Sequence, residues 1–284
     1  MNEALKKQIA EHLRGYCGRM GSQNKAANSM KGVSAATISH ILSGEWALIK
    51  DEMWRSVAAQ SGFKTDDWQA VETRDYKLLY NILQDAQANA LVMAVTGESG
   101  TGKSFAVKHF SAQNREAYLL SCAEYWNRRM FLAELLAVMG RDSSGYTVAE
   151  MMNEVVRYLK VADRPILIVD EADKLSDQVL YFFITIYNQL EDHCGIVLCA
   201  TDHLAKRIIR GRKLNKKGYK EIYSRIGRRF VELKGLGAAD IAAVCQANGI
   251  AEKNDIREVV DDSEGDLRRV KRKIHAIKQR NQSI

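Results

Sequence analysis

The segment that most constrains the fold of this chain is GESGTGKS, at residues 97–104. It fits the spacing G-x-x-x-x-G-K-[S/T], in which glycines allow a backbone curl whose N–H groups point at phosphate oxygens. A helix that begins at this curl adds its positive N-terminal end to the same anion site. We expect Lys103 to reach the β- and γ-phosphates of a nucleotide, and the Ser104 hydroxyl to bind Mg²⁺. The residues expected to hold the nucleotide are Gly97, Glu98, Ser99, Gly100, Thr101, Gly102, Lys103 and Ser104.

Short apolar runs and helical patterns alternate around this loop. The apolar runs lie at residues 90–95, 118–121, 166–169, 196–200 and 230–233. The predicted helices that separate them lie at residues 103–112, 127–139, 147–161 and 177–191. Strands that alternate with helices in this way form a parallel sheet with helices on both faces. The sequence therefore predicts an α/β core, followed by a small helical lid with helices at residues 238–248, 252–262 and 266–281.

Two carboxylates follow the third apolar run, in the sequence ILIVDE at residues 166–171. A buried strand delivers both side chains to its C-terminal end, at the sheet edge where the phosphate loop also lies. We expect Asp170 to order Mg²⁺ through water and Glu171 to polarise the water that attacks the γ-phosphate. The alternative is an ordinary strand that runs into a helix cap. Beside a phosphate loop, the two acids favour a site that binds ATP with Mg²⁺ and hydrolyses the ATP to ADP and phosphate.

The first 62 residues have a different pattern, of short helices joined by turns with small residues. Ser34 is expected to cap a helix at residues 35–42 that Gly44 ends, and Asp51 is expected to cap a further helix. Helix, tight turn and helix in this order form the helix-turn-helix layout. The segment SQNKAANSMKGVSAATISHILSGEW resembles the phage-repressor-like helix-turn-helix family over its 25 residues.

The helix at residues 35–42 exposes small, uncharged side chains. If this helix enters a DNA groove, Thr37, Ser39 and His40 face the bases. Lys25 and Lys31 then hold phosphates, which positions the domain without reading sequence. None of the groove-facing residues is Arg, Asn or Gln, the side chains that make bidentate base contacts. We therefore expect docking on double-stranded DNA with little base discrimination. The alternative is a helical module that binds a protein or has no ligand.

Basic side chains gather in one stretch of the chain. The formal net charge is +7, and residues 206–229 hold eleven Lys or Arg against Glu221 as the only acid. Such an excess of basic over acidic residues favours contact with a polyanion. The alternative is a set of solvated faces and a mobile loop. A second basic stretch covers residues 268–280. The side chains of the first stretch that are expected to contact DNA are Lys206, Arg207, Arg210, Arg212, Lys213, Lys216 and Lys217.

The phosphate loop and the DE pair resemble the Walker A and Walker B motifs of AAA+ ATPases, and the resemblance covers residues 76–284. It implies two further site residues. Thr201, which follows the fourth apolar run, is similar to the sensor 1 residue of that family, which senses the γ-phosphate. Arg268, in the sequence GDLR, is similar to the sensor 2 residue of the lid, which contacts the nucleotide.

The resemblance also implies an arginine finger. Arg225, in the sequence SRIGRRF, is similar to that residue, with Arg228 or Arg229 as the alternatives. A finger of this family acts across a subunit boundary, which implies a homo-oligomer in the form of a ring or a helical filament. The residues that the resemblance makes catalytic are Lys103, Glu171, Thr201 and Arg225.

The order of the parts narrows the family. We predict a helix-turn-helix domain at residues 1–62, a linker at 63–75, an ATPase core at 76–234 and the lid at 235–284. This order resembles the AAA+ transposition ATPases, a family that includes the target-capture B protein of phage Mu together with TnsC and IstB. The resemblance implies ATP-dependent assembly on double-stranded DNA, delivery of target DNA to a transposase, and disassembly driven by ATP hydrolysis.

Two other classes of protein share these motifs. An Orc-like replication initiator or a DnaC-like helicase loader also carries sequences similar to GDLR and SRIGRR. Initiators usually have a winged-helix domain after the lid, which is not expected in a chain that ends at Ile284. An ATP-gated transcription regulator is the third class, and the uncharged recognition helix counts against it.

Three features bear on the compartment. No apolar run reaches the roughly 18–20 residues of a membrane span, and the first residues lack the apolar core of a signal peptide. The five cysteines form no C-x-x-C pair and have no matching histidine spacing. Reduced core thiols are therefore expected in preference to a zinc site. We expect a cytoplasmic protein with no membrane partner.

Overall fold

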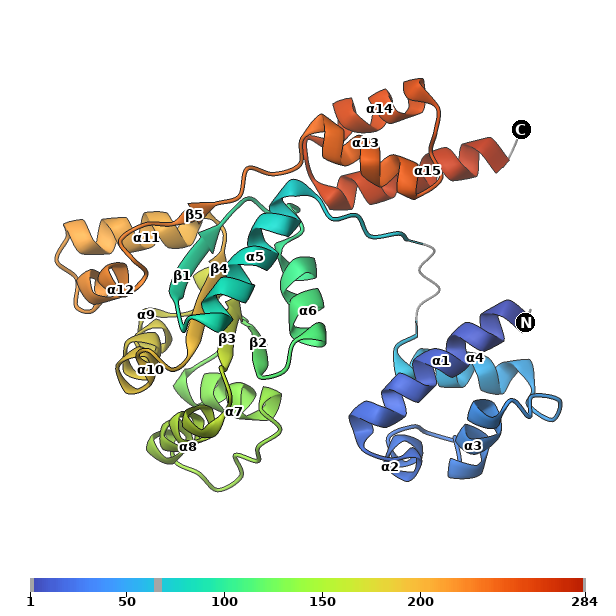
Figure 1. Ribbon diagram of the computed structural model, residues 1–284, viewed down its shortest axis with the longest axis horizontal. Coiled ribbons are helices and arrows are strands. Elements are labelled where there is room, and N and C mark those ends of the chain that lie inside the picture. The colour runs from blue at the N-terminus through green and yellow to red at the C-terminus, as the bar shows by residue number, and fades with distance from the viewer. Residues whose placement is uncertain (1–2, 64–67, 283–284) are drawn as a thin grey trace. The chain divides into compact units, whose positions relative to one another are not determined.

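A computed structural model describes residues 3–63 and 68–282 of the chain (Figure 1). Contacts between residues divide the chain into two compact units, Met1–Gln69 and Ala70–Ile284. Residues 64–67 of the expected linker lie outside the described residues. Among the described helices, none combines the length and the apolar character needed to cross a membrane.

The N-terminal unit consists of four helices around one small core. The helices are α1 (Glu3–Met20), α2 (Gln23–Asn28), α3 (Ala35–Ser43) and α4 (Asp51–Ser61). Their shared core includes fully buried Leu13, Ile38 and Trp54. Four short helices with a contiguous apolar core of this kind make a self-contained bundle.

Two helices of this unit begin at a serine whose side chain caps the helix, and a third helix lacks the side-chain cap that the sequence predicts. Ser22 Oγ accepts a hydrogen bond from the backbone N–H of Lys25, and Ser34 Oγ accepts one from that of Thr37, both at 3.1 Å. The expected cap of α4 is wrong: Lys50 is the N-cap residue, without a side-chain cap bond, and Asp51 is the first helical residue. The Asp51 carboxylate lies 3.6 Å from the Lys6 ammonium instead, since α1 packs beside α4.

The second unit is built on a five-stranded, wholly parallel sheet with the order β2-β3-β4-β1-β5. The strands are β1 (Val92–Thr96), β2 (Ala117–Ser121), β3 (Ile166–Asp170), β4 (Gly195–Ala200) and β5 (Val231–Glu232). β1 lies between β4 and β5, and β3 lies between β2 and β4. This order sets the C-terminal ends of β1, β3 and β4 close together at one edge of the sheet, where α/β folds bind their ligands.

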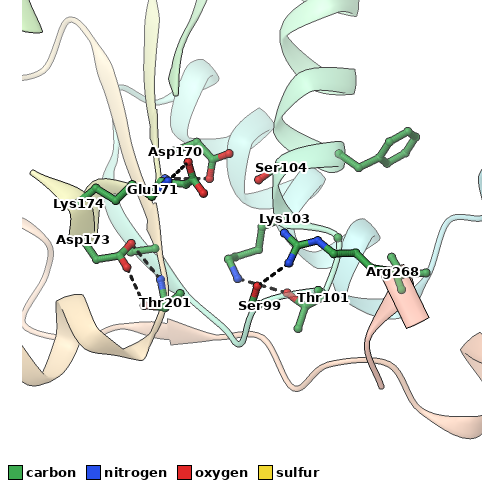
Figure 2. A pocket seen from close by; sticks show the side chains of 15 residues that line it. Ser99, Thr101, Lys103, Ser104, Asp170, Glu171, Asp173, Lys174, Thr201 and Arg268 are labelled. Atoms are coloured by element: carbon green, nitrogen blue, oxygen red, sulfur yellow. Dashed lines mark hydrogen bonds and ion pairs between the residues drawn. The ribbon is translucent and has the colours of Figure 1, made fainter. Parts of the chain in front are cut away.

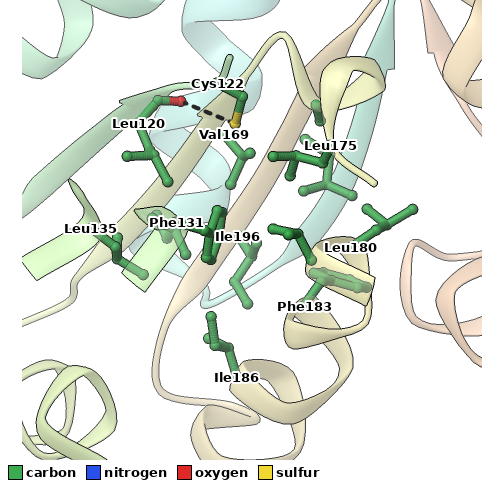
Figure 3. Packing of buried hydrophobic residues seen from close by; sticks show 14 of the residues in the cluster. Leu120, Cys122, Phe131, Leu135, Val169, Leu175, Leu180, Phe183, Ile186 and Ile196 are labelled. Carbon is green, nitrogen blue, oxygen red and sulfur yellow. Dashed lines mark hydrogen bonds between the residues drawn. The ribbon is translucent and has the colours of Figure 1, made fainter. Parts of the chain in front are cut away.

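Helices cover both faces of the sheet, because both faces of its central strands are apolar. On one face, Leu83 of α5 (Arg74–Ala88) and Phe110 of α6 (Lys103–Gln113) pack with Ile168. On the other, the helices α7 (Arg128–Val138) and α10 (Phe182–Leu190) pack with Val169 and Ile196 (Figure 3), and α8 (Val148–Val161) packs on these two helices. The predicted α/β core with a parallel sheet is confirmed.

Two segments fold differently from the prediction. The single helix expected at residues 177–191 is a short α9 (Asp177–Leu180) followed by α10, and the turn η1 (Ala172–Lys174) precedes it. No helix was expected in the first basic stretch, yet it contains α11 (Asp202–Lys213) and α12 (Tyr219–Arg225). Four of their apolar side chains, Leu204, Ile208, Tyr219 and Ile222, are buried. Charged residues outnumber the apolar ones in this stretch, so the apolar residues alone give only a weak helical pattern in the sequence.

The lid contains α13 (Ala238–Ala247), α14 (Lys253–Ser263) and α15 (Leu267–Gln282), close to the predicted bounds. The second basic stretch lies on α15, where acids of α14 meet several of its charges. Arg280 Nη2 lies 2.7 Å from a carboxylate oxygen of Asp255, and Lys273 pairs with Asp262 and Glu258. This part of the basic charge is therefore used within the lid itself.

The cysteines are buried thiols. All five are free, and each has a raised thiol pKa because burial disfavours the thiolate.

Candidate functional site

The phosphate loop joins β1 to α6 and is anchored at its start to the neighbouring strand. The backbone N–H of Gly97 donates to the carbonyl of Ala200 in β4, at 3.2 Å. Gly100 and Gly102 adopt φ values of 84° and 92°, a region that favours glycine. The loop thus has the curl that its spacing predicts, and α6 begins at Lys103. A cavity of about 310 Å³ opens here, bounded by the loop, the end of β3, Thr201 and Arg268.

Lys103 lies across the mouth of the loop (Figure 2). Its ammonium donates to the carbonyls of Gly97 and Glu98 at 2.6 and 2.7 Å. Burial lowers its pKa, and the nearby Asp170 carboxylate opposes that shift. The backbone groups and Asp170 thus keep a cation at the point where the spacing predicts contact with phosphate.

Asp170 ends β3 with only 2% of its surface exposed. Burial raises the pKa of its carboxyl, although hydrogen bonds from the Ser104 hydroxyl and the Glu171 N–H oppose the shift. One carboxylate oxygen accepts the Glu171 N–H at 3.0 Å. A hydroxyl and a carboxylate that meet beside a phosphate loop are the hard oxygen ligands that Mg²⁺ prefers. The residues present therefore fit an Mg²⁺ ion, which the Ser104 hydroxyl would bind directly and Asp170 would hold through water.

Glu171 has a left-handed backbone conformation, with φ of 57°. Its carboxylate lies 2.9 Å from the ammonium of Lys174, and both side chains are partly exposed. The pKa of Lys174 is raised, first by its hydrogen bond to Glu171. Sequence reasoning did not identify Lys174, although it stands three residues after the predicted base.

Thr201 lies between β4 and α11, at the same edge of the sheet. Its hydroxyl donates to Asp173 Oδ2 at 2.8 Å, and its backbone N–H donates to Asp173 Oδ1 at 3.3 Å (Figure 2). Asp173 is a second residue that sequence reasoning missed. The available signal was its place in the run DEADK, because a residue two positions after Glu171 must lie at the same strand end.

The lid meets the phosphate loop at the start of α15. The guanidinium of Arg268 donates to Ser99 Oγ at 2.9 Å, and the N–H of Leu267 donates to the carbonyl of Gly100 at 3.0 Å. A Cβ atom on Gly100 would lie 2.3 Å from Cγ of Asp266. The GDLR sequence is therefore brought directly onto the loop, and glycine at position 100 makes the close approach possible.

Arg225, the first choice for an arginine finger, is engaged within its own chain. Its Nη2 donates to Asn188 Oδ1 at 2.7 Å, and the guanidinium lies 5.1 Å from the centre of the Tyr187 ring. Arg228 and Arg229 follow a glycine turn and are exposed. Among the described residues, their guanidinium groups make no ion pair or hydrogen bond. The two alternatives are thus freer to reach a second subunit than Arg225.

Most of the expected DNA-contacting residues in the first basic stretch form one exposed surface. We call this surface the basic hairpin; it consists of the exposed residues Lys206, Arg210, Lys213, Lys216, Lys217 and Lys220 on α11, α12 and the turn between them. Arg212 is half-buried beneath the ring of Tyr223, 4.2 Å from the ring centre. Arg207 has a different place: its guanidinium points into the unit and bonds to Asp177 and Tyr219. We leave Arg207 out of the proposed DNA surface for this reason.

The expected DNA contacts of the N-terminal unit lie on α2, on α3 and in the turn between them. Lys25, Lys31, Ser39 and His40 are exposed, and Thr37 is half-buried. The hydroxyl of Thr37 is 2.9 Å from that of Ser34, the cap of α3. His40 Nδ1 lies 2.5 Å from a carboxylate oxygen of Glu45. An acid so close to the end of α3 weakens the attraction of this face for phosphate.

Comparisons with known proteins agree with this geometry. Residues 86–208 match the AAA domain family. The Mu-like prophage FluMu DNA transposition protein B of Haemophilus influenzae is 25% identical over 194 residues, which cover 67% of this chain and 65% of the relative. The ATP-dependent target DNA activator B of Escherichia phage D108 is 23% identical over 190 residues, which cover 66% of this chain and 58% of the relative. This chain therefore spans less than two thirds of the length of either curated relative.

A solved structure supports the fold. AMPPCP-bound DnaA from Aquifex aeolicus superposes with a TM-score of 0.50 and 18% identity, over 76% of this chain and 66% of that chain. Together with the parallel sheet, its helices and the lid, this likeness identifies an AAA+ P-loop core.

Proposed function

We propose that this AAA+ chain, which resembles the B proteins of Mu-like phages, is an ATPase that oligomerises on double-stranded DNA and delivers target DNA to a transposase. The observation that carries the proposal is the placement of the basic hairpin: α11 begins directly after Thr201 in the nucleotide site and continues into this exposed surface, where six Lys or Arg outnumber the two acids of the helices, Asp202 and Glu221. The printed names of the two relatives, a DNA transposition protein and a target DNA activator, support the same role.

The residues of the site have separable tasks in this proposal. Lys103, the loop N–H groups and the N-terminal end of α6 bind the phosphates, and Arg268 closes the lid over them. Ser104 and Asp170 would hold Mg²⁺, which neutralises phosphate charge when it is bound. Glu171 orients and polarises the attacking water, and Thr201, whose hydroxyl meets Asp173 at the same strand end, is the residue that senses the γ-phosphate. ATP hydrolysis then releases the contacts that depend on the γ-phosphate and drives disassembly.

Binding to DNA is proposed to be largely independent of sequence. The basic hairpin offers ammonium and guanidinium groups, which contact phosphates, and α3 offers only short, uncharged side chains toward bases. Lys25 and Lys31 add phosphate contacts from the N-terminal unit. Affinity should then fall steeply with salt, because each phosphate contact releases counterions. A protein that must accept many target sites needs this kind of binding.

Electron microscopy with ATP and random-sequence duplex DNA tests the proposal. Rings or helical filaments that cover the DNA are the expected result. Discrete footprints on one sequence would instead favour a transcription regulator, and the target-capture proposal would have to be abandoned. Requirement for an origin sequence or a helicase partner would favour the replication alternative.

Mixing two inactive variants tests the shared site. In a mixture of Glu171→Gln and Arg228→Ala proteins, a site with an intact Glu171 can receive an intact arginine from its neighbour. Recovered hydrolysis supports a finger that acts in trans from position 228. The same mixture with Arg225→Ala is the matched comparison, because Arg225 is bonded to Asn188 of its own chain. If hydrolysis is recovered only in the mixture with Arg225→Ala, then Arg225 is the arginine finger.

A further inference from the structure

Arg207 is the basic residue of α11 that points inward. Only 25% of its side chain is exposed, and its Nη2 lies 2.5 Å from Asp177 Oδ1. Its Nη1 donates to the carbonyl of Leu175 at 2.6 Å and to that of Asp173 at 3.4 Å. A planar guanidinium with several donors in a fixed fork suits this set of acceptors, and an ammonium does not. Arg207 thus fastens α11 to the segment that directly follows the DE pair.

Tyr219 extends this connection to α12. Its ring is 1% exposed, and its hydroxyl donates to Asp177 Oδ1 at 2.7 Å and lies 3.0 Å from Arg207 Nε. Burial opposes the charge of Asp177, but the bonds from Tyr219 and Arg207 outweigh it and lower the pKa of this carboxyl. A Cβ atom on Gly211 would lie 2.5 Å from the Tyr219 ring, so α11 and α12 pack in close contact here. The two helices of the basic hairpin therefore share one partly buried polar cluster.

The same segment carries residues of the nucleotide site. Asp173 accepts hydrogen bonds from both the hydroxyl and the N–H of Thr201, the N-cap residue of α11. Lys174, the next residue, pairs with Glu171. The stretch from Glu171 to Asp177 is thus bonded to α11 at two points, Thr201 and Arg207, which lie six residues apart. A displacement of α11 must either move this stretch or break those bonds.

We propose that Arg207 is a positioning residue that couples polyanion binding on the basic hairpin to ATP hydrolysis at Glu171. This inference rests on the proposed function, since it requires that duplex DNA binds the basic hairpin. Like charges that crowd the free hairpin repel one another, and DNA phosphates remove that repulsion. The resulting shift of α11 is transmitted to residues 171–177 at two points. The Arg207 guanidinium pulls on Asp177, and Thr201, at the start of the helix, pulls on Asp173.

The experiment measures ATP hydrolysis by the full-length chain without DNA and at saturating random-sequence duplex. The variants are Arg207→Gln, Arg207→Lys and Tyr219→Phe, the last of which removes only a hydroxyl and keeps the buried ring. The ratio of the saturated to the DNA-free rate should fall by about tenfold, the scale of ordinary allosteric coupling. Arg207→Lys should not restore the ratio, because one ammonium cannot satisfy both the carbonyls and the carboxylate. DNA affinity and its salt dependence should stay as in the wild type.

Arg210→Gln is the matched control, because Arg210 lies one turn further along α11 and is exposed. It should weaken DNA binding and lower the slope of log affinity against log salt by about one. Its rate ratio at saturating DNA should fall far less than that of Arg207→Gln, because five of the six charges of the basic hairpin remain and the bonds of Arg207 are intact. Opposite effects of the two arginine variants, one on coupling and one on affinity, support the inference.

The inference is overturned if Arg207→Gln and Tyr219→Phe keep the wild-type rate ratio. It is also overturned if their rates with and without DNA fall in equal proportion, since that is the result of a merely structural role. These results leave the proposed function intact, because the wild type still binds DNA and responds to it. A wild-type protein that does not bind duplex DNA, in contrast, overturns the proposed function and this inference together.

Discussion

Gly100 is the point where the lid touches the phosphate loop, and Gly100→Ala tests how much that contact contributes. The added Cβ would lie 2.3–2.6 Å from three carboxyl atoms of Asp266. Asp266 cannot simply swing away, because its Oδ1 accepts the N–H of Arg268 at 2.7 Å. The start of α15 must therefore move off the loop, which stretches the bond from Leu267 N to Gly100 O and withdraws Arg268 from Ser99.

The magnitude follows from two terms. A left-handed backbone costs about 1–2 kcal/mol for alanine relative to glycine, and overpacking adds about 1–3 kcal/mol. Gly145→Ala isolates the first term, because Gly145 has φ of 77° and no atom within 4 Å of an added Cβ. The Gly100 variant should thus be less stable than the Gly145 variant by about 2 kcal/mol, which corresponds to roughly 4–8 °C in Tm for a unit of this size.

Thermal unfolding of the two variants and titration with a fluorescent ATP analogue give the readouts. Loss of the Arg268 contact should raise the Kd for the nucleotide by about tenfold, the equivalent of one charge-assisted hydrogen bond. The Gly145 variant should bind as the wild type does. If the two variants melt within a degree or so of each other and bind the analogue equally well, the close contact between Gly100 and the lid does not contribute to stability or nucleotide affinity as reasoned above.

Three further predictions concern the site and the basic hairpin. Asp170→Asn should raise the Tm of the nucleotide-free protein at neutral pH and abolish hydrolysis, because burial raises the pKa of this carboxyl and its ionisation then opposes folding. The gain should shrink as the pH falls through the raised folded-state pKa and should level off below the unfolded-state pKa of about 3.9, because the carboxyl is then protonated in both states. A gain that grows as the pH falls would contradict this expectation. Glu171→Gln should slow phosphate release by roughly 10²–10⁴-fold while the ATP-bound oligomer persists in light scattering; unchanged turnover would remove Glu171 from the role of base. Lys216→Ala should lower the salt slope of DNA affinity by about one, whereas Lys160→Ala, an exposed lysine of α8, should leave it unchanged; equal effects would argue against the basic hairpin.

The two proposals place different demands on the basic stretch. The proposed function needs its exposed members as phosphate contacts, and the inference about Arg207 needs one member to be withdrawn from solvent. Both conditions hold on one helix, since α11 buries Leu204, Ile208 and Gly211 and exposes Arg210 and Lys213. A single amphipathic helix can thus face DNA on one side and the nucleotide site on the other.

The sequence by itself determined the phosphate loop, the DE pair and the α/β core. These depend on residues that are consecutive or on a repeating pattern, so local backbone geometry and burial are enough to place them. The glycines of residues 97–104 allow the backbone curl that a phosphate loop requires. The four apolar residues before Asp170 predict a buried strand that ends at this residue. The lid helices were found for the same reason, from their own periodicity.

Only the tertiary structure decided what those residues touch. Asp173 meets Thr201, Arg268 meets Ser99 and Arg225 meets Asn188 across 28, 169 and 37 positions of the chain. No spacing rule predicts such pairs, because they arise where separate elements pack together. Arg207 shows the limit most clearly: in the sequence it is one of eleven similar charges. Its inward direction follows from its place on α11, where the buried side of the helix meets Asp177 and Tyr219.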